Sequence, residues 1–179
     1  MASARPDIDD ATRQFIEQQS VFFVASAPLS GEGRVNLSPK GLDTLRVLSP
    51  TRVAYLDLGG SGNETSAHVL ENGRLTMMFC SFGPSPKILR LFGRGRVVVP
   101  SDPDWAQEYA RFDPCPGARQ VVVLDVHRVQ SSCGYGVPLM EAVGPRALLA
   151  DKRAAAQGWY CPDGNRASID GLPTHLAAR

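Results

Sequence analysis

The chain has 179 residues, 43% of them hydrophobic and 21% charged, a composition typical of one globular domain and unlike that of disordered or fibrous chains. Nineteen basic and eighteen acidic side chains leave a net charge of +1, which gives no electrostatic footprint for nucleic acid or an anionic membrane. No apolar run approaches the length of a membrane span and the polar, acidic start is unlike a secretory signal, so we expect a cytoplasmic location.

The N-terminal half of the chain predicts one helix followed by strands. Residues 7–19 form an amphipathic helical pattern, with Ile8 and Ile16 on one face and Asp7 or Asp9 as the N-cap. The strand patterns that follow lie at residues 21–27, 34–38, 52–58 and 74–80. The tripeptide PKG at residues 39–41 is expected to end the second strand, because proline cannot donate to a ladder.

The C-terminal half predicts two long strands and two helices. Residues 87–99 form a strand pattern in which Gly93 and Gly95 predict a bend or bulge, as where a barrel turns a corner. The remaining predicted elements are a helix at 101–112, a strand at 119–129 and a helix at 145–158. Six strands with few helices between them favour a mainly β (α+β), antiparallel fold in one domain, closed as a barrel or a sandwich. It would comprise an N-terminal helix (1–20), a barrel (21–130) and a C-terminal loop and helix (131–179).

A glycine cluster lies between the third strand and the next helical pattern. Residues 58–74 are LGGSGNETSAHVLENGR, in which Ser61 or Asn63 is a suitable N-cap and Gly73 a suitable end for a helix. A dinucleotide fold is not predicted, because Thr65 occupies the third glycine position and no parallel βαβ unit follows. The free N–H groups of the first turn would suit a phosphate. A connector helix without a ligand is the alternative, and this segment by itself favours the alternative.

The sequence has no pattern for a metal site or a hydrolase. Its cysteines are far apart, form no CxxC pair and are expected to be reduced and mostly structural: Cys80, Cys115, Cys133 and Cys161. No histidines cluster, and no Ser-His-Asp or Cys-His arrangement can be recognised. We therefore predict neither metal binding nor hydrolysis.

Three segments taken together resemble the pyridoxamine 5′-phosphate oxidase-like family of FMN-binding split β-barrels. They are RVNLSPKGLDTLRVL, YLDLGGSGNETSAHVLENGRLTMMFCSF and KILRLFGRGRVV, within a resemblance that covers about Phe15 to Val129. The tail pieces SSCGYGVPLM and ASIDGLP resemble a poorly characterised bacterial subgroup. The resemblance implies a six-stranded antiparallel split β-barrel with flanking helices. It also implies a homodimer that binds two FMN molecules at the subunit interface.

The resemblance also implies where the cofactor would be bound. One group of candidates follows the strand along the flavin ring, a second lies on the next strand, and a third surrounds the start of the following helix. Lys87 begins a strand that crosses the site. The full set of cofactor-binding candidates is Asn36, Leu37, Ser38, Pro39, Lys40, Leu56, Asp57, Ser61, Asn63, Glu64, Thr65, His68 and Lys87.

The candidate phosphate site departs from the family pattern. Glu64 and Thr65 stand where the true oxidases carry an arginine and a lysine, and an acid beside a phosphate is repulsive. Lys40 and Lys87, with Arg90 or Arg94 from neighbouring strands, are the cations expected to compensate. His68, one helical turn beyond, is interpreted either as a donor to the phosphate or flavin edge or as a half-exposed helix histidine.

Two functional hypotheses follow from the resemblance. The first is an FMN-dependent oxidoreductase that acts on a small organic substrate, with no catalytic side chain assigned. The second is a non-catalytic protein that binds or handles flavin, the deazaflavin F420 or haem. Vitamin B6 oxidation is not predicted, because the tail lacks a clear match for the arginine and histidine that hold pyridoxal phosphate in the true oxidases.

Overall fold

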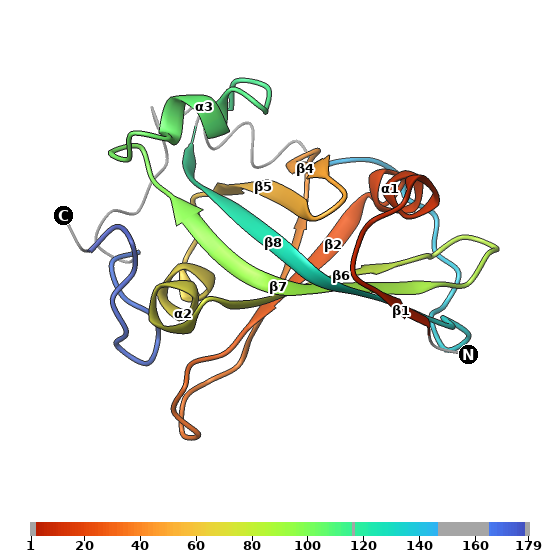
Figure 1. The fold of residues 1–179 in the computed structure, drawn as a ribbon, viewed down its shortest axis with the longest axis horizontal. Coiled ribbons are helices and arrows are strands. Elements are labelled where there is room, and N and C mark those ends of the chain that lie inside the picture. The colour runs from red at the N-terminus through yellow and green to blue at the C-terminus, as the bar shows by residue number, and fades with distance from the viewer. Residues whose placement is uncertain (1–2, 116, 147–164, 178–179) are drawn as a thin grey trace.

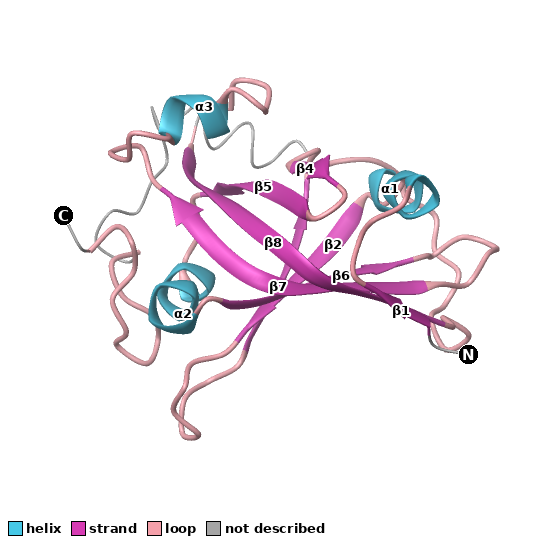
Figure 2. Ribbon diagram, viewed as in Figure 1, coloured by secondary structure: helices cyan, strands magenta, loops and turns pink. Residues whose placement is uncertain are grey.

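Eight strands form a single antiparallel sheet in the described part of the chain. The computed structural model describes residues 3–115, 117–146 and 165–177. The strands are β1 (Ser3–Arg5), β2 (Val21–Ser26), β3 (Asn36–Gly41), β4 (Leu45–Ser49), β5 (Arg52–Leu58), β6 (Arg74–Cys80), β7 (Ile88–Val98) and β8 (Ala118–Ser132). They pair in the order β3-β2-β6-β7-β8-β5-β4, with β1 added on β8. The sheet curls into a half-barrel (Figures 1 and 2), which confirms the predicted mainly β split barrel.

The expected number of six strands is wrong, because β1 and β4 were not predicted. β1 has three residues, too few for an alternating pattern, and gains its ladder only by pairing with β8. β4 is a five-residue strand paired with β5 across a tight turn. β1 forms by pairing with the distant strand β8, and β4 forms by pairing with its neighbour β5. Neither segment has a strong strand pattern in its own sequence.

Strand β3 also differs from its predicted extent, because Pro39 does not end it. β3 continues to Gly41, and Pro39 lies opposite Phe23 of β2. A proline is tolerated at this position because β3 is the first strand in the pairing order and has a partner on one side only. The two later strands β5 and β6 match their predicted bounds.

The core fills the concave side of the sheet. Phe22 contacts Tyr55 edge-on at 5.7 Å between ring centroids and stacks on Phe79 at 5.9 Å. A second, smaller cluster that includes Ala54 and Leu56 covers the other face of β5. β5 is therefore buried on both faces. Asp57, near the C-terminal end of this strand, is also buried, at a position where a charged side chain needs partners.

Three helices cover the sheet in the described residues: α1 (Asp10–Glu17), α2 (Glu64–Asn72) and α3 (Trp105–Tyr109). Asp9 caps α1 by accepting a hydrogen bond from the Thr12 N–H at 2.8 Å, which confirms one of the two predicted caps. Gly73 ends α2 in a left-handed conformation (φ 72°), as predicted. No helix among the described residues is long and apolar enough to cross a membrane.

The remaining helix predictions have different outcomes. α3 has five residues and is much shorter than the predicted 101–112 helix. The helix predicted at 145–158 falls almost entirely on residues 147–164, which lie outside the described residues.

A β-bulge lies at the predicted position, but its extra residue is His127 of β8 rather than a residue of β7. The register between β7 and β8 shifts between Phe92 and Gly93, as in a β-bulge. A Cβ at Gly93 would lie 2.0 Å from the carbonyl oxygen of Asp125, so the close approach of the two backbones requires glycine. The bulge twists the longest strand pair and helps the sheet to curl.

Candidate functional site

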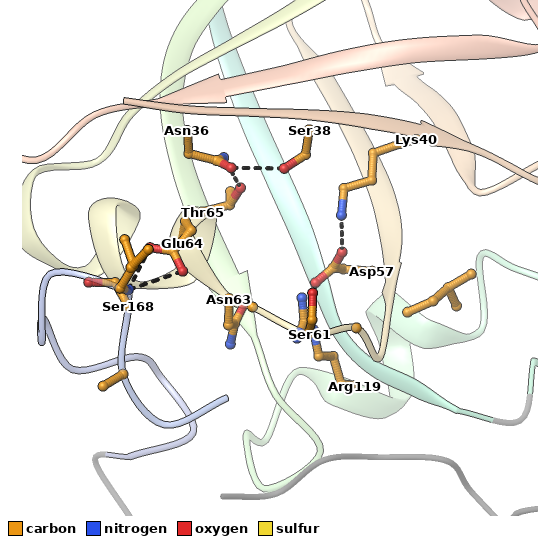
Figure 3. Close-up of a pocket in the computed structure, with 15 residues that line it drawn as sticks. Asn36, Ser38, Lys40, Asp57, Ser61, Asn63, Glu64, Thr65, Arg119 and Ser168 are labelled. Atoms are coloured by element: carbon orange, nitrogen blue, oxygen red, sulfur yellow. Dashed lines mark hydrogen bonds and ion pairs between the residues drawn. The ribbon is translucent and has the colours of Figure 1, made fainter. Parts of the chain in front are cut away.

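A cavity of about 600 Å³ opens where β3, β5, the start of α2 and the C-terminal segment meet (Figure 3). Its walls carry many polar side chains and the glycine-rich backbone between β5 and α2. The lining residues are Asn36, Ser38, Lys40, Asp57, Leu58, Gly60, Ser61, Gly62, Asn63, Glu64, Thr65, Arg119, Ala167, Ser168 and Ile169.

A bulge at the start of β8 brings an arginine into this cavity. Asp57 of β5 lies opposite Gln120, while the next residue, Leu58, lies opposite Ala118. Arg119 is therefore the extra residue of the bulge, which re-aims its side chain toward Asp57. Arg119 Nε and Gln120 Nε2 both donate to Asp57 Oδ2 at 2.8 Å.

Asp57 is the centre of a buried charge cluster. Its side chain is almost completely buried, and Lys40 Nζ donates to its other oxygen, Oδ1, at 2.7 Å. Burial opposes ionisation of the carboxyl, but Lys40 and Arg119 outweigh burial and hold the pKa of Asp57 below its ordinary value of 3.8. Asp57 is therefore a carboxylate at neutral pH, facing two cations.

The cluster retains an unused donor. Arg119 is 4% exposed, yet its Nη1 atom is buried and has no hydrogen-bond partner among the described residues. An unpaired guanidinium nitrogen in a buried position is costly, so it indicates a group that the described part of the chain does not supply. The two cations exceed the single carboxylate between them, and the missing partner is therefore expected to be an anion.

The start of α2 adds further donors to the same cavity. Its N-cap residue, Asn63, makes no side-chain capping bond, so the first-turn N–H groups remain available. The Asn63 side chain is instead 2% exposed and bonded to Gln120, with its Oδ1 accepting from Gln120 Nε2 at 2.7 Å. The Asn63–Gln120 hydrogen bond connects the start of α2 to β8, and it therefore places the start of α2 beside Asp57.

Glu64, the acid expected to repel a phosphate, has a different partner. Its carboxylate accepts the Ile169 N–H of the C-terminal segment at 3.0 and 3.2 Å. An acidic residue in the first turn also interacts favourably with the helix dipole. The side chain therefore has a structural role in holding the C-terminal segment against the helix.

A hydrogen-bonded network extends from the β3 wall of the cavity to the buried His68. Asn36 Nδ2 donates to Thr65 Oγ1 at 3.0 Å and to Ser26 Oγ at 3.2 Å, while Asn36 Oδ1 accepts from Ser38 Oγ at 2.8 Å. Ser26 Oγ also lies 3.0 Å from His68 Nδ1. These contacts fix the orientation of the polar groups that β3 and α2 present to the cavity.

His68 itself lies beneath the cavity and is fully buried, not half-exposed as in one of its two interpretations. Burial lowers the pKa of His68 below its ordinary value of 6.5, against the opposing effect of the Glu64, Glu71 and Asp170 carboxylates. The ring is therefore neutral at neutral pH and supports the network through Ser26.

Most of the predicted cofactor-binding residues are brought together in this cavity, and the exceptions have physical reasons. Leu37 and Pro39 alternate with Asn36, Ser38 and Lys40 along β3 and face the opposite side.

Besides the buried His68, Leu56 and Lys87 are the other exceptions. Leu56 packs in the second hydrophobic cluster. Lys87 lies elsewhere, with its Nζ atom 4.4 Å from the centroid of the Phe15 ring on α1. A single chain therefore does not bring Lys87 to the same cavity as Lys40 and Asn63.

A second, larger cavity of about 1510 Å³ adjoins the first. Lys40 and Leu58 line both cavities, and Pro39 and Leu56 line the second. Its wall combines the end of α1, the β3–β4 turn and residues 142–146, apart from residue 143. A ligand anchored in the first cavity thus has adjoining space on the far side of Lys40.

Arg119 was missed by the sequence analysis, although it supplies the unpaired donor. It begins a predicted strand, where a charged residue is unremarkable. Only the pairing of β8 with β5 places it beside Asp57, and only the bulge turns it inward. Ser168 and Ile169 were also missed as site residues, because no local pattern shows that a segment more than one hundred residues away returns to α2.

Comparison with known proteins adds sequence evidence to this geometry. The family model described as pyridoxamine 5′-phosphate oxidase matches residues 8–133. The Aspergillus flavus protein ustO, named as a pyridoxamine 5′-phosphate oxidase family protein, is 48% identical over 138 residues. That match covers 75% of this chain but only 55% of the length of the relative.

Solved structures share the fold at low sequence identity. HupZ of Group A Streptococcus has a TM-score of 0.54 and 18% identity, covering 68% of this chain and 91% of that chain. A Lactobacillus delbrueckii structure, described as a candidate pyridoxamine 5′-phosphate oxidase, has a TM-score of 0.52 and 18% identity, covering 70% of this chain and 98% of that chain. At this identity the likeness concerns the fold alone.

Proposed function

Because this chain belongs to the pyridoxamine 5′-phosphate oxidase family, we propose that it is a flavin-binding protein and that its polar cavity holds the phosphate of FMN. The observation that carries the proposal is the buried, unpaired Nη1 of Arg119. A phosphate oxygen would supply the acceptor that the residues described in the structure do not offer.

The residues present fit such a group. Arg119 and Lys40 supply positive charge, the first turn of α2 supplies backbone N–H groups, and Ser61 supplies a hydroxyl. Asp57 keeps both cations in place without cancelling their combined charge. Of the cations expected from the sequence, Lys40 lines the cavity, whereas Lys87, Arg90 and Arg94 do not. Arg119 is the second cation of the cavity, and it was not expected.

We further propose that the protein is an oxidoreductase acting on a small organic molecule. A bound flavin supplies electron and hydride transfer. The chain would orient the ring through the network around Asn36 and Ser38, and would exclude water from one side of it. The second cavity beyond Lys40 offers space for the ring and for the molecule with which it exchanges electrons.

A second candidate is a protein that binds or handles flavin, deazaflavin or haem without turning over a substrate. One observation favours it: the acidic side chains lining the described cavity are already engaged. Asp57 is fully paired, and Glu64 holds the Ile169 N–H. His68 is buried behind the wall. Neither carboxylate is thus poised to exchange a proton with a substrate.

We also propose that the protein is a homodimer. Strand β3 lies at an end of the pairing order and carries exposed apolar side chains, with Leu37 63% exposed, preceded by Val35 at 74%. A second chain packed there would cover these side chains close to the cavity. The predicted role of Lys87 requires such a partner, because Lys87 does not reach the cavity of its own chain.

The absorption spectrum of the purified protein tests the proposed function. Flavin bands that remain after gel filtration, or that appear on titration with FMN at micromolar concentration, are the expected result. Rapid reduction of the bound flavin by NADH or NADPH would favour the oxidoreductase, and a bound flavin that resists reduction would favour the second candidate. A protein that binds no flavin would contradict the proposal.

A further inference from the structure

The C-terminal segment, residues 165–177, returns to the cavity and forms part of its wall. It lies beyond residues 8–133 that the family model matches. Ala167, Ser168 and Ile169 line the cavity on the side where α2 begins (Figure 3). This wall is therefore a feature of this chain that the family match does not include.

Buried polar contacts attach the segment to the site. Asn165 is fully buried, and its Nδ2 donates to the Gly60 carbonyl at 3.1 Å. Its own carbonyl accepts from Asn63 Nδ2 at 3.3 Å and from Thr174 Oγ1 at 2.7 Å. A segment attached by buried hydrogen bonds has a defined position, because breaking them would leave polar groups unsatisfied.

Residues 168–171 form a tight turn at the cavity. The Gly171 N–H donates to the Ser168 carbonyl at 3.0 Å, and Gly171 adopts a φ of 79°, which favours glycine. Ser168 Oγ accepts the N–H groups of Asp170 at 3.2 Å and Leu172 at 3.1 Å. Hydrogen bonds among residues 168–172 thus stabilise the conformation of the turn.

Two carboxylates fix this turn to the rest of the chain. Glu64 accepts the Ile169 N–H, and Asp170 accepts the Arg34 N–H at 2.7 Å and forms an ion pair with its guanidinium. Glu64 therefore places negative charge at this side of the cavity, while the charge of Asp170 is paired with Arg34. The Ile169 side chain, 70% exposed, stands at the edge and offers no donor to an anion.

Building on the phosphate site proposed above, we propose that the turn at residues 168–171 selects flavins whose phosphate is terminal. A phosphate monoester ends against this wall, with its charge directed to Arg119 and the start of α2. A flavin dinucleotide would have to continue past Ile169, and its second phosphate would approach the Glu64 carboxylate, which lines the cavity. The turn therefore favours FMN over FAD by blocking extension and by repulsion.

Binding of FMN, FAD and riboflavin to the full-length protein tests this inference. The wild-type protein is expected to bind FMN more tightly than either of the other two. Ile169→Lys places a cation on the wall and should shift the ratio of FMN to FAD affinity toward FAD by about tenfold, because the second phosphate gains a charged partner. Leu29→Lys is the matched control, since Leu29 is 65% exposed and lines neither cavity.

A complementary variant reports on the terminal phosphate. Ile169→Asp should weaken FMN binding and leave riboflavin binding unchanged, since riboflavin has no phosphate to be repelled. Thermal unfolding of each variant checks that the exposed substitution leaves the fold intact.

The outcomes separate the inference from the proposed function. FAD binding as tight as FMN binding, or an unchanged ratio in Ile169→Lys, would overturn the role of the turn while leaving the flavin site in place. Equal wild-type affinity for FMN and riboflavin, or no flavin binding at all, would overturn the phosphate site and the inference with it.

Discussion

We propose that the charged residues around Asp57 serve ligand binding more than stability. A buried ion pair contributes little net stabilisation, because desolvation offsets the attraction between the charges. Here one carboxylate holds two cations, and one of them keeps an unpaired nitrogen. This arrangement maintains positive charge in a polar cavity, which a stable fold by itself does not require.

Replacing Arg119 with lysine separates its two proposed contacts. A lysine keeps the charge but lacks the planar fork that would allow one side chain to bond Asp57 and a phosphate together. We expect Arg119→Lys to lose about 1.5–3 kcal/mol of FMN binding free energy and to leave riboflavin binding nearly unchanged. Fluorescence titration of both flavins measures this, and equal weakening of the two would contradict a phosphate contact.

Asp57 should make stability depend on pH in the acid range. Its pKa is lower in the folded chain than its ordinary 3.8, so its stabilising contribution is present above that value and is lost as pH falls through the folded pKa. Asp57→Asn removes the titrating group, and the free energy of unfolding should therefore fall less steeply on acidification. At neutral pH the variant should be destabilised by about 3–5 kcal/mol, because two buried cations lose their carboxylate.

Urea unfolding at neutral and acidic pH measures the effect of Asp57. The matched control is Asp43→Asn, since the Asp43 side chain is 79% exposed in its pair with Arg46. If the Asp57 and Asp43 variants have the same pH dependence as the wild-type protein, the buried cluster does not contribute as described.

At the scale of elements, two β-bulges affect the curvature of the sheet and the lining of the cavity. The bulge at His127 of β8, opposite Gly93 of β7, helps the sheet to curl, and the bulge at Arg119 of β8 turns a charged side chain into the cavity. Both involve β8, the strand that pairs with β1, β5 and β7. The longest strand thus carries the deformations that the fold and the site need.

The close approach of β7 and β8 at Gly93, opposite the His127 bulge, can be tested directly. Gly93→Ala would place a methyl group 2.0 Å from the Asp125 carbonyl oxygen, and backbone atoms on both strands would have to move. We expect a loss of about 3 kcal/mol of unfolding free energy in urea denaturation. Gly31→Ala, where nothing lies within 4 Å of the added Cβ, should change stability little; a neutral Gly93→Ala would show that the strands tolerate separation.

At the scale of the whole molecule, the exposed β3 edge is where a second chain is expected to pack. Light scattering should therefore give the mass of a dimer. Leu37→Asp would place a charge in that interface and should weaken dimerisation by about tenfold or more, because an unpaired charge is costly to bury. Leu29→Asp serves as the control, and a wild-type monomer that binds flavin would contradict a site shared between chains.

The success of sequence reasoning differed between parts of the fold for identifiable reasons. β5 and β6 were predicted with correct bounds because both are runs of strand-forming residues, nearly all buried in β5 and alternately buried in β6. Pro39 misled the prediction of β3, since whether a proline is tolerated depends on which strands lie beside it. Lys87 was grouped with Lys40 by resemblance, whereas in one chain it packs on Phe15.

The sequence by itself determined the family, the mainly β fold, the core strands and the residues of β3, β5 and α2 that meet at the cavity. These follow from local periodicity, turn chemistry and motif order, which are written in neighbouring residues. Only the tertiary structure decided that Arg119 faces Asp57, that His68 is buried and that Glu64 holds the distant segment 165–177. The reason is physical: strand pairing, bulges and burial arise from contacts between segments far apart in the chain, which no local pattern encodes.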